Sequence, residues 1–273
     1  MKKEVEVMDI LVRYSEIGLK GKNRGNFENR LVDNLRSCLR DIKADFKIIL
    51  RPRGRIIIRG VLEAEVVVRK LTRIFGIISL SPAFRIETNF NKISQKALEI
   101  YGSKIPKTFR ITTQRLNKEF EYNSHELNCE VGGVIFDKYK NAKVSLEKPD
   151  LDIGIEIISD EAYLFTERIE GLGGLPVATQ GVVRLDFKTK EDLVAGFLMF
   201  KRGCSIYSVG KIPSLIKNFS YGNTFSSNTL KSKVVANINS GDIEKLCKCD
   251  TLFPLIGYTK KEINKIYKLM EKI

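Results

Sequence analysis

The segment 182–192 has the residue order in which α/β nucleotide enzymes hold phosphate: an apolar strand, a short turn and the start of a helix. Such a site needs bare backbone amides at the helix N-terminus. The turn contains no glycine, so side chains obstruct the close approach of phosphate. Asp186, Glu191 and Asp192 add negative charge beside it, which Lys188 and Lys190 offset in part.

Two interpretations of this turn are open. In one, Asp186, Lys188 and Asp192 lie beside a bound nucleotide phosphate, which the family resemblance described below would make that of ATP. In the other, Asp192 only caps the helix, which is the commoner role of an aspartate at a helix N-terminus. The sequence assigns no catalytic residue under the second interpretation.

Cysteine and histidine do not form a recognisable metal site. Cys247 and Cys249 could carry a persulfide or bind a metal, but no third or fourth ligand lies near them and the chain has one histidine. Cys129 and Cys204 lie in apolar runs, and we expect both in the core. His125 stands beside a helix cap, which indicates a structural role rather than that of a general base. We predict no metal.

Basic side chains concentrate in the loop 18–25 and the turn 51–54, and others lie along a strand and loop at 108–118. A single arginine on a strand edge is usually only solvated, but a cluster on the loops of one small module is typical of phosphate contacts. Few aromatic residues lie among them, which favours folded RNA over stacked single strands. The candidate RNA contacts are Arg13, Lys20, Lys22, Arg24, Arg51, Arg53, Arg55, Arg110, Arg115 and Lys118.

The chain of 273 residues has a formal charge of +14 at pH 7. The excess lies in residues 1–60 and 176–273, whereas the middle is close to neutral. Such an excess indicates a polyanionic partner, most plausibly nucleic acid, although a solubilising lysine-rich surface is the alternative. No apolar run approaches the roughly 18–20 residues of a membrane-spanning helix, and the start has no signal-peptide pattern. We expect a cytoplasmic protein without membrane contact.

These residues need elements to position them, and residues 1–88 predict the order strand, helix, two strands, helix, strand. That order is typical of a ferredoxin-like sandwich. A second α/β module follows, with a capping box at Asn123 and Glu126 before a helix. A loop rich in glycine at 171–181 then leads into a third part with alternating strands and helices. The predicted elements of the first module are 5–17, 27–42, 46–50, 55–58, 62–75 and 77–88.

Four stretches, in chain order, resemble the tRNA 4-thiouridine synthetase family, the sulfurtransferases also linked to thiamine biosynthesis. They are residues 13–24 with Phe27 and Glu28, 108–115 with Phe120 and Ser124, 171–177, and 254–257 with 260–263. A glycine is usual in the family where Ser15 stands. The resemblance covers nearly the whole chain and implies a ferredoxin-like module and a THUMP domain that together bind tRNA. It also implies a pyrophosphatase-loop ATPase domain.

The last of these domains departs from the family pattern. The family has Ser-Gly-Gly-x-Asp-Ser after the first strand, where this sequence has Lys188-Thr189-Lys190-Glu191-Asp192-Leu193. The C-x-x-C segment of the family is also missing. We therefore expect a degenerate, truncated Rossmann-like domain.

The sequence predicts an α/β protein with a ferredoxin-like domain at 1–76, a THUMP domain at 77–174 and the degenerate domain at 175–273. The leading hypothesis is a tRNA-binding protein that grips the acceptor-stem region, has no cofactor and presents tRNA to a separate modifying enzyme. The alternative is an active ATP-dependent tRNA sulfurtransferase that makes 4-thiouridine with ATP and Mg²⁺. A third hypothesis makes the C-terminal domain a homodimer interface.

Overall fold

The computed structural model describes residues 7–14, 16–52, 54–223, 225, 233–235 and 251–273. The chain divides into two compact units, and each is described by itself. Unit 1 comprises the chain up to Arg13, 45–68 and 80–169, and unit 2 comprises 14–44, 69–79 and 170–273.

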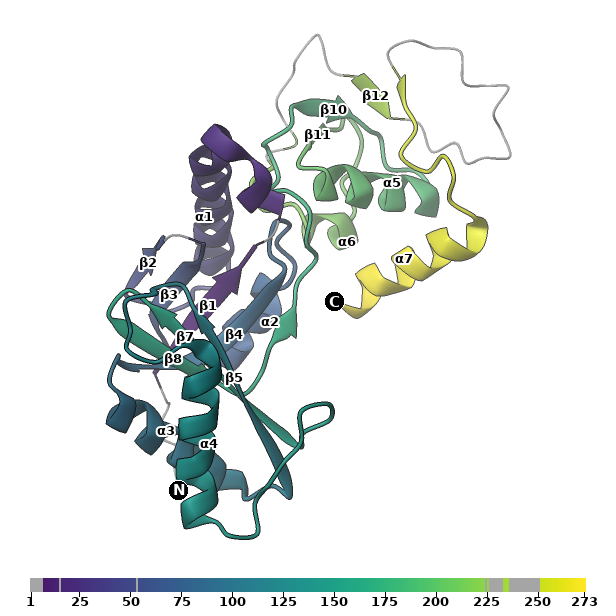
Figure 1. Cartoon of the computed structure of the whole chain (residues 1–273). Helices are drawn as coiled ribbons and strands as arrows, with labels where there is room; N and C mark the ends of the chain where they lie inside the picture. Colours follow the sequence, from purple (N-terminus) through teal and green to yellow (C-terminus); the bar gives the residue numbers. More distant parts are fainter. Residues whose placement is uncertain (1–6, 15, 53, 224, 226–232, 236–250) are drawn as a thin grey trace. The chain divides into compact units, whose positions relative to one another are not determined.

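Unit 1 is built on one mixed sheet to which both predicted N-terminal modules contribute (Figure 1). Strand β4 lies between β1 and β8, so the strands of the first module continue into those of the second. The residue patterns of the two modules predict two separate sheets and do not indicate this continuity. The order is β2 (Ile48–Leu50), β3 (Ile56–Val61), β1 (Met8–Arg13), β4 (Ser79–Glu87), β8 (Glu161–Phe165), β7 (Leu151–Ile158), β5 (Thr108–Arg115) and β6 (Lys143–Val144).

Register in this sheet follows from apolar alternation and β-branched content. β1 and β3 are antiparallel, whereas β5 and β7 are parallel over 109–115 and 151–157. β7 is buried over most of its length because it has β5 on one side and β8 on the other. Gly154 in β7 stands opposite Phe165, and a Cβ there would come within 2.3 Å of the phenyl ring.

Helices α3 (Phe90–Lys104) and α4 (Ser124–Lys138) pack against each other, and α4 also packs against β5. The predicted capping box of α4 is confirmed: the Asn123 side chain accepts from the backbone N–H of Glu126, whose carboxylate accepts from Asn123 N–H. Cys204 is buried as expected, but Cys129 is exposed, so its assignment to the core was wrong. Helix α2 (Ala64–Leu71) ends earlier than predicted, because Arg73 and Ile74 form tighter i−3 turns.

Unit 2 contains a second sheet in which all neighbouring strands are parallel, in the order β11, β10, β12, β13. Helix α5 packs against β11 and α7, which makes this part Rossmann-like. The strands of this sheet are β10 (Val182–Arg184), β11 (Ser205–Tyr207), β12 (Lys233–Val235) and β13 (Thr251–Leu252). The short strand β9 (Ile169–Glu170) pairs with β4 in the first sheet instead. The helices are α1 (Arg24–Asp41), α5 (Lys190–Lys201), α6 (Ser214–Lys217) and α7 (Lys260–Lys272), with 3₁₀ turns at Glu16–Leu19 and Gly21–Asn23.

Candidate nucleic-acid interface

Two of the predicted RNA contacts, Arg13 and Arg55, are buried in unit 1, and both bind the carboxylate of Glu156. Arg13 Nε donates to Glu156 Oε1 at 2.6 Å, and Arg55 Nε donates to Glu156 Oε2 at 2.7 Å. Arg13 Nη1 also donates to Ser81 Oγ at 2.9 Å, and Arg55 Nη2 to Gln114 Oε1 at 2.8 Å. Arg13 is 1% exposed, Arg55 9% and Glu156 2%. The cluster joins β1, β4, β5, β7 and the residue that precedes β3, so its members are positioned to hold the sheet together.

This burial revises the set of candidate phosphate contacts. Burial lowers the pKa of the Arg13 guanidinium, although Glu156 opposes that effect. Burial alone would raise the pKa of Glu156, but the hydrogen bond from Arg55 and the charge of Arg13 bring it below its usual value. We therefore remove Arg13 and Arg55 from the candidate RNA contacts, because both guanidinium groups are committed to Glu156 and their side chains are only 2% and 10% exposed.

Glu156 was not among the residues predicted from the sequence, although its position in the sequence indicates a buried charge. A single acidic residue interrupts the otherwise apolar run 153–158 in the middle of a predicted strand. Buried charges are paired in folded proteins, so such a residue predicts a cationic partner from another strand. The sequence could not tell which of the many arginines would be that partner.

Two further arginines of unit 1 also bind within the unit. Arg110 donates to the carbonyl oxygen of Leu146 at 2.6 Å and pairs with Asp152. Arg115 Nη1 donates to the carbonyl oxygens of Phe120 at 3.0 Å and Tyr122 at 2.7 Å. Both are part-exposed and fix the loops beside them. Lys118, on the loop that Arg115 holds, is exposed, as is Arg51, whereas Arg53 lies outside the described residues.

The basic loop of unit 2 has a fixed inner part and an exposed outer part. Arg24 Nε donates to Glu28 at 2.7 Å and Arg24 Nη2 to Tyr14 Oη at 2.8 Å, while Tyr14 donates to Glu28. Burial and the bond to Glu28 raise the pKa of Tyr14 to about 12. The ammonium of Lys20 lies 5.1 Å from the ring centroid of Phe27. Of the three predicted cations here, Lys22 is the most exposed.

The backbone N–H groups of the turn before α5 donate hydrogen bonds to the side chain of Asp192. Asp192 Oδ2 accepts from the backbone N–H of Lys188 at 3.0 Å and of Thr189 at 2.8 Å. Thr189 in turn caps α5 through the backbone N–H of Asp192, and Asp192 is 6% exposed. These N–H groups are the ones that a phosphate would need. ATP phosphates therefore do not fit this turn as it is folded.

The side chains of the other two candidate ATP residues, Asp186 and Lys188, make no hydrogen bond or ion pair with Asp192 in the described part of the chain. Asp186 accepts from the backbone N–H of Val209 at 3.0 Å, and this bond is the first cause of its lowered pKa. The Lys188 side chain is exposed. Lys190 donates to Asn264 Oδ1 at 2.7 Å, and its ammonium lies 4.4 Å from the ring centroid of Tyr267 in α7.

Neither metal ligands nor a membrane span contribute to a site in the described ranges. The residues the structure describes hold no group of three His, Cys, Asp or Glu side chains that could bind a metal ion. None of their helices is long and apolar enough to cross a membrane. His125 is exposed on the first turn of α4, with its ring 3.8 Å from the sulfur of Cys129. Cys247 and Cys249 lie outside the described residues.

Comparison with known families identifies both parts of the N-terminal sheet. Residues 9–81 match the ThiI ferredoxin-like domain and residues 87–167 match the THUMP domain, together more than half of the chain. The chain belongs to the ThiI-type THUMP family. This membership confirms the resemblance on which the sequence analysis relied, and it confirms a ferredoxin-like and a THUMP domain followed by a Rossmann-like sheet.

Relatives of this THUMP protein are known from sequence and structure. It is 36% identical over 234 residues to a probable tRNA sulfurtransferase of Thermococcus kodakarensis, covering 78% of this chain and 61% of that protein. The crystal structure of PH1313 from Pyrococcus horikoshii Ot3 matches with a TM-score of 0.83 and 30% identity, over 97% of this chain and 99% of that one. A 4-thiouridine synthetase, solved as an RNA complex with bound ATP, matches with a TM-score of 0.64 and 31% identity, over 80% of this chain and 60% of that one. The chain spans 50% to 62% of the length of the curated relatives it matches.

Proposed function

We propose that this protein binds tRNA through its ferredoxin-like and THUMP domains and takes part in tRNA sulfuration. The observation that carries the proposal is the match, over 80% of the chain, to a 4-thiouridine synthetase crystallised with RNA. The presence of both N-terminal domains and the names of the curated relatives support it.

Binding of this kind depends on charge at the surface rather than on the buried arginines. The net charge of +14 favours a polyanion, and Lys22, Arg51 and Lys118 are exposed cations on loops. Lysine and arginine contacts to phosphate release counterions and supply affinity that does not depend on sequence. The proposed contacts are therefore to the backbone of a folded RNA, and the acceptor-stem region is proposed by analogy with the family.

Whether this protein itself catalyses the sulfuration is a separate question, and two observations favour opposite answers. The names of the relatives favour the ATP-dependent sulfurtransferase over a protein without activity. The contact of Asp192 with the amides of residues 188 and 189 favours a tRNA-binding protein that needs a separate modifying enzyme. ATP and Mg²⁺ are cofactors only in the first case, and a homodimer through the C-terminal part is a further proposal.

Titration of tRNA at rising salt tests the binding. We expect the logarithm of the association constant to fall linearly with the logarithm of salt concentration, with a slope of roughly 0.9 per phosphate contacted. Lys22→Ala and Lys118→Ala should each reduce the slope by about one, whereas Arg13→Lys should leave it unchanged. The measurement is fluorescence anisotropy with labelled tRNA. A salt-independent association constant would contradict the proposal.

Incubation with ATP and tRNA distinguishes an active sulfurtransferase from a tRNA-binding protein without its own activity. Because Asp192 occupies the amides that would hold phosphate, we expect no pyrophosphate above the level released without protein. A coupled pyrophosphate assay measures this, with a family member that has the Ser-Gly-Gly-x-Asp-Ser sequence as positive control. Pyrophosphate release that requires both tRNA and ATP would establish the sulfurtransferase hypothesis instead.

A further inference from the structure

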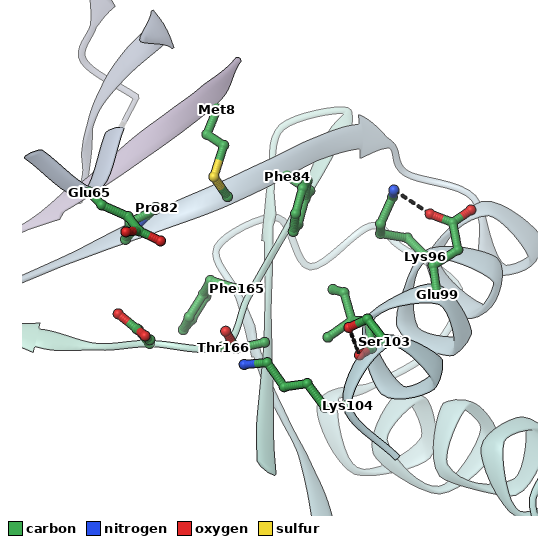
Figure 2. A pocket seen from close by; sticks show the side chains of 12 residues that line it. Met8, Glu65, Pro82, Phe84, Lys96, Glu99, Ser103, Lys104, Phe165 and Thr166 are labelled. Atoms are coloured by element: carbon green, nitrogen blue, oxygen red, sulfur yellow. Dashed lines mark hydrogen bonds and ion pairs between the residues drawn. The ribbon is translucent and has the colours of Figure 1, made fainter. Parts of the chain in front are cut away.

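Two hollows in the described part of the chain are lined by none of the predicted RNA contacts. The first, in unit 1, has a volume of about 400 Å³ and is lined by side chains of both signs, among them the ion pair of Lys96 and Glu99 (Figure 2). Such a mixture favours neither an anion nor a cation. The second is a groove of about 500 Å³ along α7 in unit 2. Its lining combines apolar side chains with three lysines and one glutamate, so it favours one kind of partner.

The groove along α7 has an apolar centre. Ile266 and Leu269 line it from the helix, and Tyr258 lines it from the residue before the Thr259 N-cap. Ile266 and Tyr258 are half-buried and pack against the core of unit 2, whereas Leu269 is 44% exposed and lies outside that core. A lone exposed leucine is ordinary, but one that extends a half-buried stripe onto the surface is typical of a docking site.

Basic side chains border this stripe along one side. Lys265, Lys268 and Lys272 are spaced by three and four residues, so they form a single row on the helix beside the apolar stripe. All three are exposed, and none of them forms an ion pair within 4.0 Å in the described part of the chain. The carboxylate of Glu262 accepts from the backbone N–H of Thr259 at 2.8 Å and is engaged in the capping box. The row therefore presents positive charge that has no paired counter-charge.

Charge and side-chain type together disfavour two occupants of the groove. A second copy of this chain would bring the same row of lysines, and like charges placed opposite each other are repulsive. An RNA would satisfy the lysines, but the aliphatic side chains of Ile266 and Leu269 offer no face on which a base could stack. The occupant must therefore supply negative charge and apolar side chains together.

We infer that the groove binds an acidic amphipathic helix of another protein. Apolar side chains at spacings of three and four would fill the apolar stripe, as in other cases of a helix bound in a groove. Carboxylates beside them would face the lysine row, where complementary charge contributes chiefly to specificity and to the association rate. The inference goes beyond tRNA binding, and a protein that presents tRNA to a separate modifying enzyme needs a protein-binding surface of this kind.

Labelled amphipathic peptides test the inference by fluorescence anisotropy with the whole chain. The acidic probe has leucine at every third or fourth position and glutamate beside each leucine, and the basic probe has lysine in place of glutamate. We expect the acidic probe to bind about tenfold more tightly, because the lysine row attracts one probe and repels the other. Leu269→Gln keeps helix propensity but removes the apolar contact, so it should weaken binding of the acidic probe about tenfold. Leu146→Gln, at a leucine that is 71% exposed and lies outside the groove, should leave this binding unchanged.

Charge reversal tests the lysine row separately. The variant that combines Lys265→Glu, Lys268→Glu and Lys272→Glu should prefer the basic probe. A control with the same net charge should keep the preference for the acidic probe. It replaces three exposed lysines of unit 1 outside the groove, by Lys104→Glu, Lys107→Glu and Lys148→Glu.

The outcomes separate this inference from the proposed function. Equal binding of the two probes, or binding that is unchanged in Leu269→Gln, would overturn the inference. Self-association in sedimentation that Leu269→Gln removes would assign the groove to a second copy, and a loss of tRNA affinity in that variant would assign it to RNA; either result also overturns the inference. Failure of the wild-type protein to bind tRNA would contradict the proposed function, whereas preferential binding of the acidic probe would still support the groove.

Discussion

Replacement of Glu156 by glutamine is expected to lower the free energy of unfolding by about 3–5 kcal/mol, the usual cost of removing one partner of a buried ion pair. The carboxylate accepts from Arg13 and Arg55, each through a different oxygen. A glutamine of the same shape has one oxygen and an amide that donates, so one guanidinium would face another donor in the interior. Two buried positive charges would then lack a counter-charge.

Urea unfolding followed by circular dichroism measures this loss, with Glu147→Gln as the control. Glu147 is an exposed glutamate of the same unit, and its replacement should change stability by no more than about 0.5 kcal/mol. The pH dependence gives a second readout. The folded-state pKa of Glu156 is lowered, so its contribution is complete above its unfolded pKa of about 4.3 and is lost as pH falls below that value. The difference between wild type and Glu156→Gln should therefore shrink in acid, and equal stability of the two variants at pH 7 would contradict the role of the cluster.

The same cluster explains why residue type alone misassigned the arginines. Arginine is usually exposed, and Arg13 belongs to a stretch that resembles an RNA-binding family, so surface contact with phosphate was the natural expectation. The burial of Arg13 depends on Glu156, which is 143 residues away in the sequence. Local patterns contain no information on pairing at such separations. Lys22 and Lys118, in contrast, lie in loops and are exposed, as their sequence context predicts.

The spacing of apolar residues in α4 already predicts that Cys129 is exposed, although the apolar run around it suggested a core position. The buried residues of α4 are Leu127, Val131 and Ile135, at spacings of four. A residue two positions from Leu127 falls on the opposite side of a helix, so Cys129 had to face solvent. The capping box at Asn123 was a more reliable signal, because a side chain that bonds the backbone three residues away needs no tertiary partner.

The most informative feature of the turn at 186–192 is that it contains no glycine. The absence of glycine predicts a backbone that is less open to phosphate, and in the structure the Asp192 carboxylate accepts hydrogen bonds from the amides of 188 and 189. The sequence could place an aspartate at the start of the helix, but both a ligand-binding role and a capping role require that position. Only the geometry distinguishes the two.

Replacement of Phe75 by alanine is expected to lower the free energy of unfolding of unit 2 by about 3–5 kcal/mol, since it leaves a cavity in an aromatic cluster. The ring centroid of Phe75 lies 5.1 Å from that of Phe197, 6.4 Å from Phe200 and 6.5 Å from Phe219. Phe75 is 1% exposed. Phe136→Ala, at a ring that is 48% exposed, is the matched control and should cost much less. Urea unfolding measures both, and a Phe75→Ala variant as stable as the control would refute the packing.

The apolar spacing in 62–75 predicts Phe75 in the last turn of a ferredoxin-like helix and does not indicate packing partners beyond residue 190. Its actual neighbours mean that unit 2 draws part of its core from residues 69–79. A chain cut at Gly181 would lose Phe197, Phe200 and Phe219 together and would expose Phe75 to water. We therefore expect such a truncation to aggregate or lose helix content rather than to yield a clean N-terminal fragment. The homodimer proposal is better tested by sedimentation of the whole chain with single substitutions on the exposed face of α7, such as Leu269→Lys, because Leu269 is 44% exposed and lies outside this aromatic cluster.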